Sequence, residues 1–181
     1  CALPISPILG LLVVYVDDFL LVSDLGQVRD SLLEGLRNVW TLTKEEVLTV
    51  QQPITFLGIE LALRDKGDIF LNQKAFIQHI LKKHGKLGHK GISAVQIEKF
   101  PADLQVPSAA ELKTLQGFSG EFNWLATRTR PDLSYYINVL ASVRSKQYDW
   151  CKLLAHQISR YLINTKDQGI FLTAEGDLND L

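Results

Sequence analysis

The sequence predicts an α+β fold in which β-hairpins come first and helices follow. Two apolar, β-rich runs, Leu11 to Val16 and Phe19 to Val22, flank a pair of aspartates, a pattern that indicates a buried β-hairpin. From residue 72 onward the apolar residues mostly recur with helical spacing. A chain of 181 residues, 46% hydrophobic and 22% charged, can bury a core in one or two domains.

The aspartate pair, Asp17 and Asp18, stands where a buried hairpin does not normally carry charge. Two neighbouring carboxylates repel each other, so the pair requires a cation, a proton or open water. At a hairpin tip both side chains can lean toward one site. The pair therefore predicts a divalent metal site, and a polar tip without metal is the alternative.

The next elements are predicted from periodicity and turn residues. Asp24 to Trp40 has helical spacing, and we expect one face of this helix to pack on the sheet. Ile54 to Leu63 and Asp68 to Leu71 are β-rich runs joined by a glycine-containing turn, which predicts a second hairpin. Gly58, inside the first of these runs, predicts a bulge or a close backbone approach.

Helices are predicted over most of the remaining chain. One begins after Asn72 as N-cap and stops at Gly85. The other predicted elements are a loop over 85–107, a helix opened by a capping box at Ser108 and running to about Thr127, helices from Thr129 and over Asp149 to Ile163, and a strand over Gly169 to Thr173.

The helix from Ser108 carries an unusual polar face. A stripe about 120° wide opposes its apolar arc, and its members are Lys113, Gln116, Gly117, Gly120, Trp124 and Arg128. A core helix has no need for a tryptophan there, nor for two glycines that each cost up to about 1 kcal/mol against alanine. Smooth backbone, an amide, a flat ring and flanking cations predict a surface for a nucleic-acid backbone and groove. A helix sandwiched between two protein layers is the alternative.

Charge is unevenly distributed along the chain, although the net value is −1. Residues 1–71 carry 5 basic and 10 acidic side chains, 72–99 carry 6 and 1, and 113–165 carry 7 and 3. This pattern suits metal ions at one place and a polyanion beside it. Ordinary solvated faces would give the same counts.

Several function classes find no support in the sequence. No apolar run approaches the roughly 20 residues of a membrane span, and no signal-peptide pattern is present. Cys1 and Cys151 are too few for a disulfide framework and lack metal-ligand spacing, which favours a reducing, intracellular location, in a cytoplasmic particle or the nucleus. Ser119 and Cys151 have no base at a recognisable spacing. The scattered histidines predict no ligand set; they are His79, His84, His89 and His156.

Four motifs, in this order, resemble the reverse transcriptase of copia-type LTR retrotransposons. They are Tyr15-Val-Asp-Asp18, Phe56-Leu-Gly-Ile-Glu-Leu61, Thr129-Arg-Pro-Asp132 and Arg160-Tyr-Leu162. The resemblance implies a partial reverse-transcriptase palm over 1–71 with the active-site hairpin and primer grip. It further implies a helical thumb over 72–130 and, over 131–181, connection helices and a first strand leading toward RNase H.

The resemblance also implies roles for the matching residues. Asp17 and Asp18 match the paired aspartates that hold two Mg²⁺ ions, or Mn²⁺, during nucleotidyl transfer, and Tyr15 and Val16 match the positions beside the primer end. The primer grip is matched by Phe56, Leu57 and Gly58. The thumb-helix face that enters the minor groove is matched by Gln116, Gly120 and Trp124.

The partners implied for the complete enzyme are an RNA or DNA template–primer duplex and dNTP. The rest of the Pol polyprotein, namely fingers, upstream palm, RNase H and integrase, is implied as well, and no membrane. This family needs a third aspartate from an upstream palm strand, whereas the sequence starts a few residues before the hairpin and has no methionine. We therefore expect a piece of a longer polypeptide that does not polymerise DNA alone.

Two other functions compete with this one. A non-catalytic module, derived from a retroelement, would hold a primer–template or a protein partner. A phospho-receiver domain also has an apolar strand ending in Asp-Asp, but it needs a further aspartate at the end of a later strand. The run from Ile54 to Leu63 ends instead in Arg64, which disfavours that fold.

Overall fold

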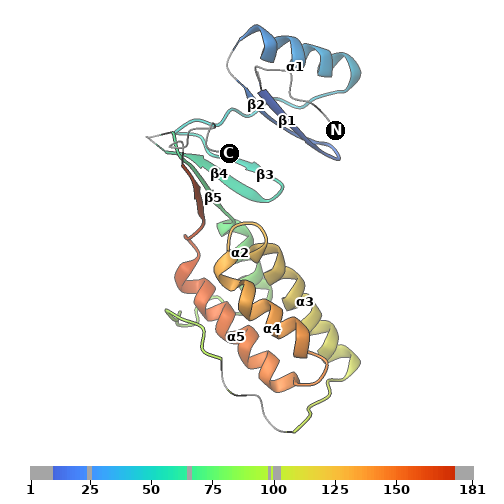
Figure 1. Ribbon diagram of the computed structural model, residues 1–181, viewed down its shortest axis with the longest axis vertical. Helices are drawn as coiled ribbons and strands as arrows, with labels where there is room; N and C mark the ends of the chain where they lie inside the picture. The colour runs from blue at the N-terminus through green and yellow to red at the C-terminus, as the bar shows by residue number, and fades with distance from the viewer. Residues whose placement is uncertain (1–9, 24–25, 65–66, 98, 100–102, 174–181) are drawn as a thin grey trace, which may run out of the picture.

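The structure is a computed structural model that describes residues 10–23, 26–64, 67–97, 99 and 103–173. Within these residues an N-terminal hairpin with its helix, an antiparallel sheet and a bundle of helices follow one another along the long axis of the molecule (Figure 1). The arrangement is α+β, as the sequence predicts.

The first hairpin consists of β1 (Gly10–Tyr15) and β2 (Asp18–Ser23), paired antiparallel. The predicted hairpin is confirmed, but the prediction that it is buried is wrong. Leu11 is 60% exposed, Val14 55% and Val22 57%. Among the described residues no further strand pairs with β1 or β2, so these apolar side chains face solvent.

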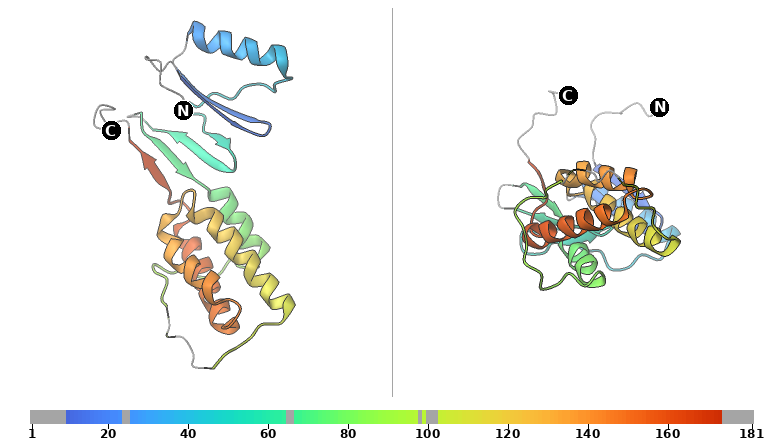
Figure 2. Two further views of the ribbon diagram at one scale, coloured as in Figure 1. Left: turned by 45° about the vertical axis from the view of Figure 1, so that its right-hand side comes forward. Right: turned by 90° about the horizontal axis from the view of Figure 1, so that it is seen from below.

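The helix after this hairpin is α1 (Gln27–Val39), which begins later than predicted. Asp24, where the prediction began, lies outside the described residues. The helix runs alongside the hairpin (Figures 1 and 2), and Trp40 at its end contacts Phe19 with ring centroids 5.8 Å apart. Its apolar face is only half-buried at Leu33 and Leu36.

The second sheet has the order β3 (Ile54–Phe56), β4 (Ile59–Leu63), β5 (Ile69–Asn72) and β6 (Ile170–Leu172). The predicted hairpin of β4 with β5 is confirmed, as is the strand near residue 170. Strand β6 pairs antiparallel with β5, so the end of the helical region returns to the sheet that precedes it.

The run from Ile54 to Leu63, predicted as one strand, is two strands joined by a tight turn. Leu57 and Gly58 have φ of 51° and 73°, the left-handed values that both central residues of a type I′ hairpin turn adopt. The predicted bulge or close approach at Gly58 is wrong, because a Cβ added there would meet no atom within 4 Å. The glycine serves the turn.

The helical region contains α2, α3, α4 and α5, with a 3₁₀ turn, η1, before α4. Their bounds are α2 (Lys74–Lys83), α3 (Ala109–Ala126), η1 (Pro131–Leu133), α4 (Ser134–Val143) and α5 (Tyr148–Thr165). The capping box between Ser108 and Glu111 is confirmed. The N-cap of α2 is Gln73, and Asn72 accepts a hydrogen bond from the backbone N–H of Lys74 at 3.0 Å.

The described part of 85–107 contains no helix and no extended strand, as predicted, apart from one β-bridge between Gln105 and Gln147. None of the described helices is long and apolar enough to cross a membrane.

One hydrophobic core joins all the helices of the bundle. Its fully buried members include Ile77 and Ile80 of α2, Leu115, Phe122 and Leu125 of α3, Leu140 of α4, and Cys151, Ile158 and Leu162 of α5. This core runs across residues 130 and 131, where the thumb is predicted to give way to the connection. The division at that point therefore stays a prediction.

Candidate functional site

The tip of the first hairpin is a two-residue turn formed by Val16 and Asp17, after Tyr15 pairs with Asp18. Val16 has φ of 55° while Asp17 does not have a positive φ, a feature of the type II′ hairpin turn. A β-branched residue in this region is strained, typically by about 1–3 kcal/mol. Strain of this kind is concentrated at functional turns.

Both carboxylates at this tip are open to solvent. Asp17 and Asp18 are exposed, and no hydrogen bond or ion pair joins the side-chain carboxylate of either to another described residue. Tyr15 and Val16 beside them are 57% and 84% exposed. The tip therefore offers adjacent, uncommitted oxygen donors of the kind that Mg²⁺ and Mn²⁺ prefer.

The donor set is nevertheless incomplete. No group of three or more His, Cys, Asp or Glu side chains that could hold a metal ion occurs within the described residues. Mg²⁺ accepts one or two carboxylates when waters and substrate phosphates complete its octahedron. The hairpin fits such a partly filled site, with further ligands supplied from elsewhere.

The residues predicted as the primer grip lie at the second hairpin tip. Phe56 ends β3, and Leu57 and Gly58 form the turn. Phe56 and Leu57 are half-buried, and Gly58 is exposed. The tips of both hairpins point to the same side of the molecule, and α3 lies along that side below them (Figures 1 and 2).

The polar stripe of α3 faces solvent. Lys113, Gln116, Gly117, Gly120 and Arg128 are exposed and Trp124 is half-buried, whereas the opposite face of the helix enters the core. A Cβ added at either glycine would meet no atom within 4 Å. Among the described residues, no second protein layer covers this face.

The tryptophan of the stripe is held by a neighbouring cation. The guanidinium carbon of Arg128 lies 4.6 Å from the ring centroid of Trp124, one turn earlier on the same face. The contact keeps the ring and a positive charge side by side at the surface. A base edge or sugar and a phosphate could each find a partner there.

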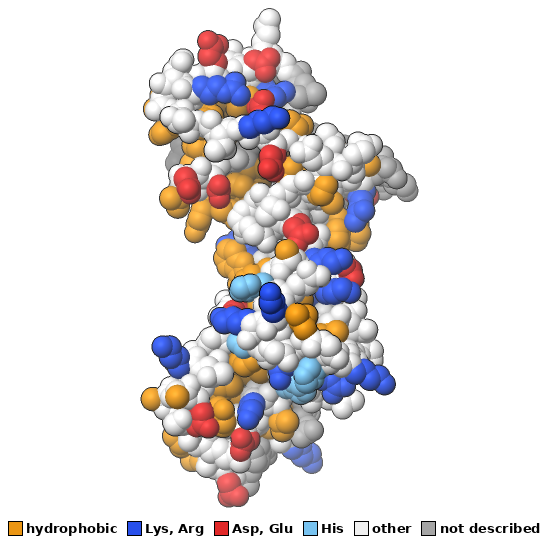
Figure 3. All heavy atoms as spheres, turned by 180° about the vertical axis from the view of Figure 1, so that it is seen from behind, with side chains coloured by type: hydrophobic (Ala, Val, Ile, Leu, Met, Phe, Trp, Pro, Cys, Tyr) orange, Lys and Arg blue, Asp and Glu red, His pale blue; other side chains and the backbone are white. Residues whose placement is uncertain are grey.

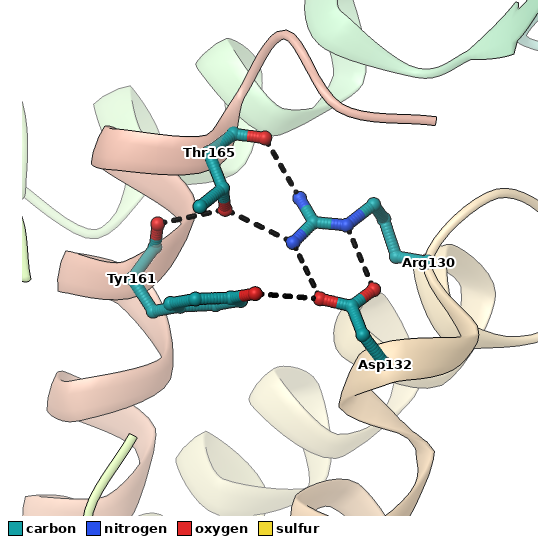
Figure 4. A network of polar contacts seen from close by, with 4 residues as sticks. All are labelled: Arg130, Asp132, Tyr161 and Thr165. Atoms are coloured by element: carbon teal, nitrogen blue, oxygen red, sulfur yellow. Dashed lines mark hydrogen bonds and ion pairs between the residues drawn. The ribbon is translucent and has the colours of Figure 1, made fainter. Parts of the chain in front are cut away.

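A buried polar network fixes the end of α3 relative to α5 (Figure 4). Arg130, 1% exposed, donates two hydrogen bonds to Asp132, at 2.9 and 2.7 Å, and two more to the carbonyl and hydroxyl of Thr165, at 3.0 and 2.9 Å. Tyr161 donates to Asp132 at 3.0 Å. Burial raises the pKa of Asp132, but the Arg130 contacts outweigh it, so the pKa is lowered overall.

A second contact fixes α3 to the end of α2. The Glu121 carboxylate accepts hydrogen bonds from Lys83 at 2.5 Å and from His84 at 2.6 Å, and the His84 ring stacks on Phe118 at 3.9 Å. Burial raises the pKa of Glu121, but these two partners lower it further than burial raises it. No sequence pattern predicts this contact, since its residues are far apart in the chain. It helps present the stripe on the outer side of the bundle.

Three curated proteins resemble this chain in sequence. It is 30% identical over 167 residues to the retrovirus-related Pol polyprotein from transposon RE2 of Arabidopsis thaliana, and 28% identical over 164 residues to that from transposon RE1. Each match covers 89% of this chain but 11% of the Pol polyprotein. It is also 26% identical over 168 residues to the uncharacterized mitochondrial protein AtMg00810 of Arabidopsis thaliana, covering 93% of this chain and 67% of that protein.

No protein-family model matches the chain, and no solved structure gives a significant match. The similarity to the two Pol polyproteins takes in 89% of the chain. The chain is thus related, over most of its length, to the retrovirus-related Pol polyproteins of plant transposons, which confirms the predicted resemblance to a retrotransposon Pol polyprotein and is consistent with the copia type.

Proposed function

We propose that this chain is part of the RNA-directed DNA polymerase of a copia-type retrotransposon, with the hairpins in its palm and α3 in its thumb. The relationship to Pol polyproteins supports this proposal. The observation that carries it is that the tip of the first hairpin, where Asp17 and Asp18 are exposed, and α3, which has an open, glycine-bearing face, lie on the same side of the molecule. A duplex lying on α3 would bring its primer end toward that tip.

At the tip, Asp17 and Asp18 would hold two Mg²⁺ ions, or Mn²⁺. Such ions activate a primer 3′-hydroxyl and neutralise charge on the phosphates of the incoming nucleotide. The chain's own residues hold the position of the primer: Tyr15 and Val16 flank its end, and the Phe56 to Gly58 turn supports its strand.

On α3, each residue type has a physical task in holding a duplex. Gly117 and Gly120 let the backbone of a nucleic acid approach the helix closely, since a Cβ at either place would occupy that space. Gln116 offers an amide to acceptors in the minor groove, and Lys113 and Arg128 offer charge to phosphates.

The isolated chain would bind a template–primer without extending it. Two-metal transfer in this family draws on a third aspartate, and the described residues contain no group of three potential ligands. The same observation favours the second candidate function, a non-catalytic module that holds a primer–template or a protein partner. The two candidates differ in whether Asp17 and Asp18 contribute once further ligands are supplied.

The apolar face of the first hairpin would be buried by another part of the Pol polyprotein. Leu11, Val14 and Val22 are each more than half exposed, and β1 has no neighbour on its outer side among the described residues. An edge strand of this kind pairs readily with another strand. A strand of the upstream palm would bury the apolar face and bring the missing carboxylate to the tip.

Binding of a fluorescent template–primer, measured by anisotropy at several salt concentrations, tests the role of α3. Gly120→Leu should weaken binding about tenfold, equivalent to 1.4 kcal/mol, because the added side chain blocks close approach while helix propensity improves. Gly35→Leu is the matched control, since Gly35 is also a helical glycine with open space beside it. Equal affinities of Gly120→Leu and wild type would exclude this face as the interface.

Mn²⁺ binding followed by electron paramagnetic resonance tests the hairpin separately. The double substitution Asp17→Asn with Asp18→Asn should abolish Mn²⁺ binding at the tip and leave duplex affinity in EDTA unchanged. Unchanged Mn²⁺ binding would show that the pair holds no metal.

A further inference from the structure

A second charged surface lies away from α3, where the loop after α2 packs against α5. The backbone N–H of Ile92 donates to the carbonyl of Arg160 at 3.2 Å, and the Arg160 guanidinium Nε donates to the carbonyl of Lys90 at 2.8 Å. These bonds tie the loop to the helix at two neighbouring points. The loop belongs to the strongly basic segment 72–99, and none of the residues in this segment is a member of the polar stripe on α3.

Close packing at Gly91 holds this loop in one place. A Cβ added to Gly91 would come within 2.8 Å of the Asn164 Cβ and 3.1 Å of the Asn164 backbone nitrogen. A side chain at this position would therefore push the loop away from α5. The groups that the loop presents next to α5 are held in a defined arrangement.

Three cations and two imidazoles meet at this surface, which we call the basic patch. Its members are Lys86, His89 and Lys90 of the loop and His156 and Arg160 of α5. The rings of His89 and His156 lie edge to face with centroids 5.6 Å apart. Figure 3 shows histidine side chains flanked by lysine and arginine side chains over the helical region. Within the described residues no ion pair engages Lys86, Lys90 or Arg160.

One ring nitrogen of His156, Nδ1, is buried without a hydrogen-bond partner among the described residues. Burial lowers the pKa of His156, and the charges of Lys86, His89 and Arg160 lower it further. These neighbours would repel a metal ion, and the described residues supply no third metal ligand. An anion would be attracted to the same groups.

We propose that the basic patch binds the phosphate groups of a single nucleic-acid strand, at a site separate from the α3 face. The loop and α3 lie on opposite sides of the bundle (Figures 1 and 2), so a stiff duplex held on α3 would not lie against the patch. A flexible unpaired strand can reach it, and several cations spread over two elements suit repeated phosphates. The choice of a nucleic acid as the source of phosphate rests on the proposed function, whereas the anion site rests on the patch itself.

The salt dependence of binding to a single-stranded oligonucleotide tests the contribution of charge. Lys86→Ala and Lys90→Ala should each reduce the slope of log K against log salt by about 0.7, the value for one phosphate contact on a single strand. Lys44→Ala removes one exposed lysine near α1 and should leave the slope unchanged. Equal slopes for all three variants and wild type would overturn the proposal.

Gly91→Ala tests the geometry without changing any charge. It should weaken oligonucleotide binding as much as a lysine substitution, because the loop can no longer pack on Asn164. Circular dichroism verifies that the bundle remains folded. Wild-type affinity in a folded Gly91→Ala variant would contradict a site built by the loop and α5.

A nuclear magnetic resonance titration of His156 identifies the occupant. The oligonucleotide should raise the His156 pKa, because nearby phosphate favours the charged imidazole. If inorganic phosphate alone gives the full rise and the oligonucleotide adds none, the site takes a free anion and the strand proposal fails. If the patch variants bind normally while Gly120→Leu loses duplex binding, the patch proposal fails and the proposed function stands.

Discussion

The first hairpin and the helical bundle contain similarly apolar segments, but the bundle buries them and the hairpin exposes them. In the bundle, Phe122, Leu125 and Ile158 are fully buried, whereas in the hairpin Leu11 and Val14 are more than half exposed. The bundle therefore closes its own core. The hairpin presents an apolar face whose burial depends on a partner, and the exposed aspartate pair lies at the end of that face.

Sequence patterns do not distinguish apolar residues that are buried within their own segment from apolar residues that need a partner to be buried. An apolar run predicts burial, but it does not say whether the covering residues belong to the same segment of chain. Truncating side chains in the two regions should give very different losses of stability.

Phe122→Ala should lower the free energy of unfolding by about 3 to 5 kcal/mol, because it opens a cavity in the bundle core. Phe122 is 0% exposed. Urea unfolding followed by helical circular dichroism measures the change. A loss below about 1 kcal/mol would mean that the bundle does not depend on this core.

Acid should destabilise the bundle through Asp132 and Glu121. Both pKa values are lowered in the folded state, from ordinary values of 3.8 and 4.5, by the basic partners Arg130, Lys83 and His84. The unfolded chain therefore binds more protons in this range, so the stabilisation is present above pH 4.5 and is lost as the pH falls through the lowered values. Because the Asp132 side chain is 39% exposed, solvent screening limits the effect.

The double substitution Asp132→Asn with Glu121→Gln tests this account. It should flatten the dependence of the urea midpoint on pH below about pH 5, where ordinary carboxyls titrate. A variant that retains the wild-type pH dependence would assign the acid sensitivity to other groups.

Val14→Ala should change the unfolding free energy of the bundle by less than about 0.5 kcal/mol, as expected for a surface substitution. Val14 is 55% exposed and belongs to the hairpin. The same urea experiment measures the change. A loss comparable with that of Phe122→Ala would show that the hairpin and the bundle unfold as one unit.

Local signals predicted the elements well. The Ser108 capping box, the periodicity of α3 and the β-rich runs gave the helix and the strands because each depends on neighbouring residues. The turn at Leu57 and Gly58 was missed, since a single apolar run favours one strand and leucine rarely adopts a positive φ.

Contacts between distant segments could not be read from the chain. The return of β6 to β5, the burial of Arg130 beside Thr165 and the pairing of His89 with His156 all join residues that no spacing rule connects. The polar stripe of α3 was predicted because it is local to one helix. That it faces open space depends on the packing of the whole bundle.

The most direct test of the proposed function is magnesium-dependent primer extension by two proteins. One is this chain, and the other is this chain joined to the preceding segment of a related Pol polyprotein. We expect no extension by the chain alone and template-dependent extension by the longer protein, abolished by Asp17→Asn with Asp18→Asn. Extension by the chain alone, or activity of the longer protein that survives the double substitution, would contradict the assignment of Asp17 and Asp18 as part of an incomplete metal site.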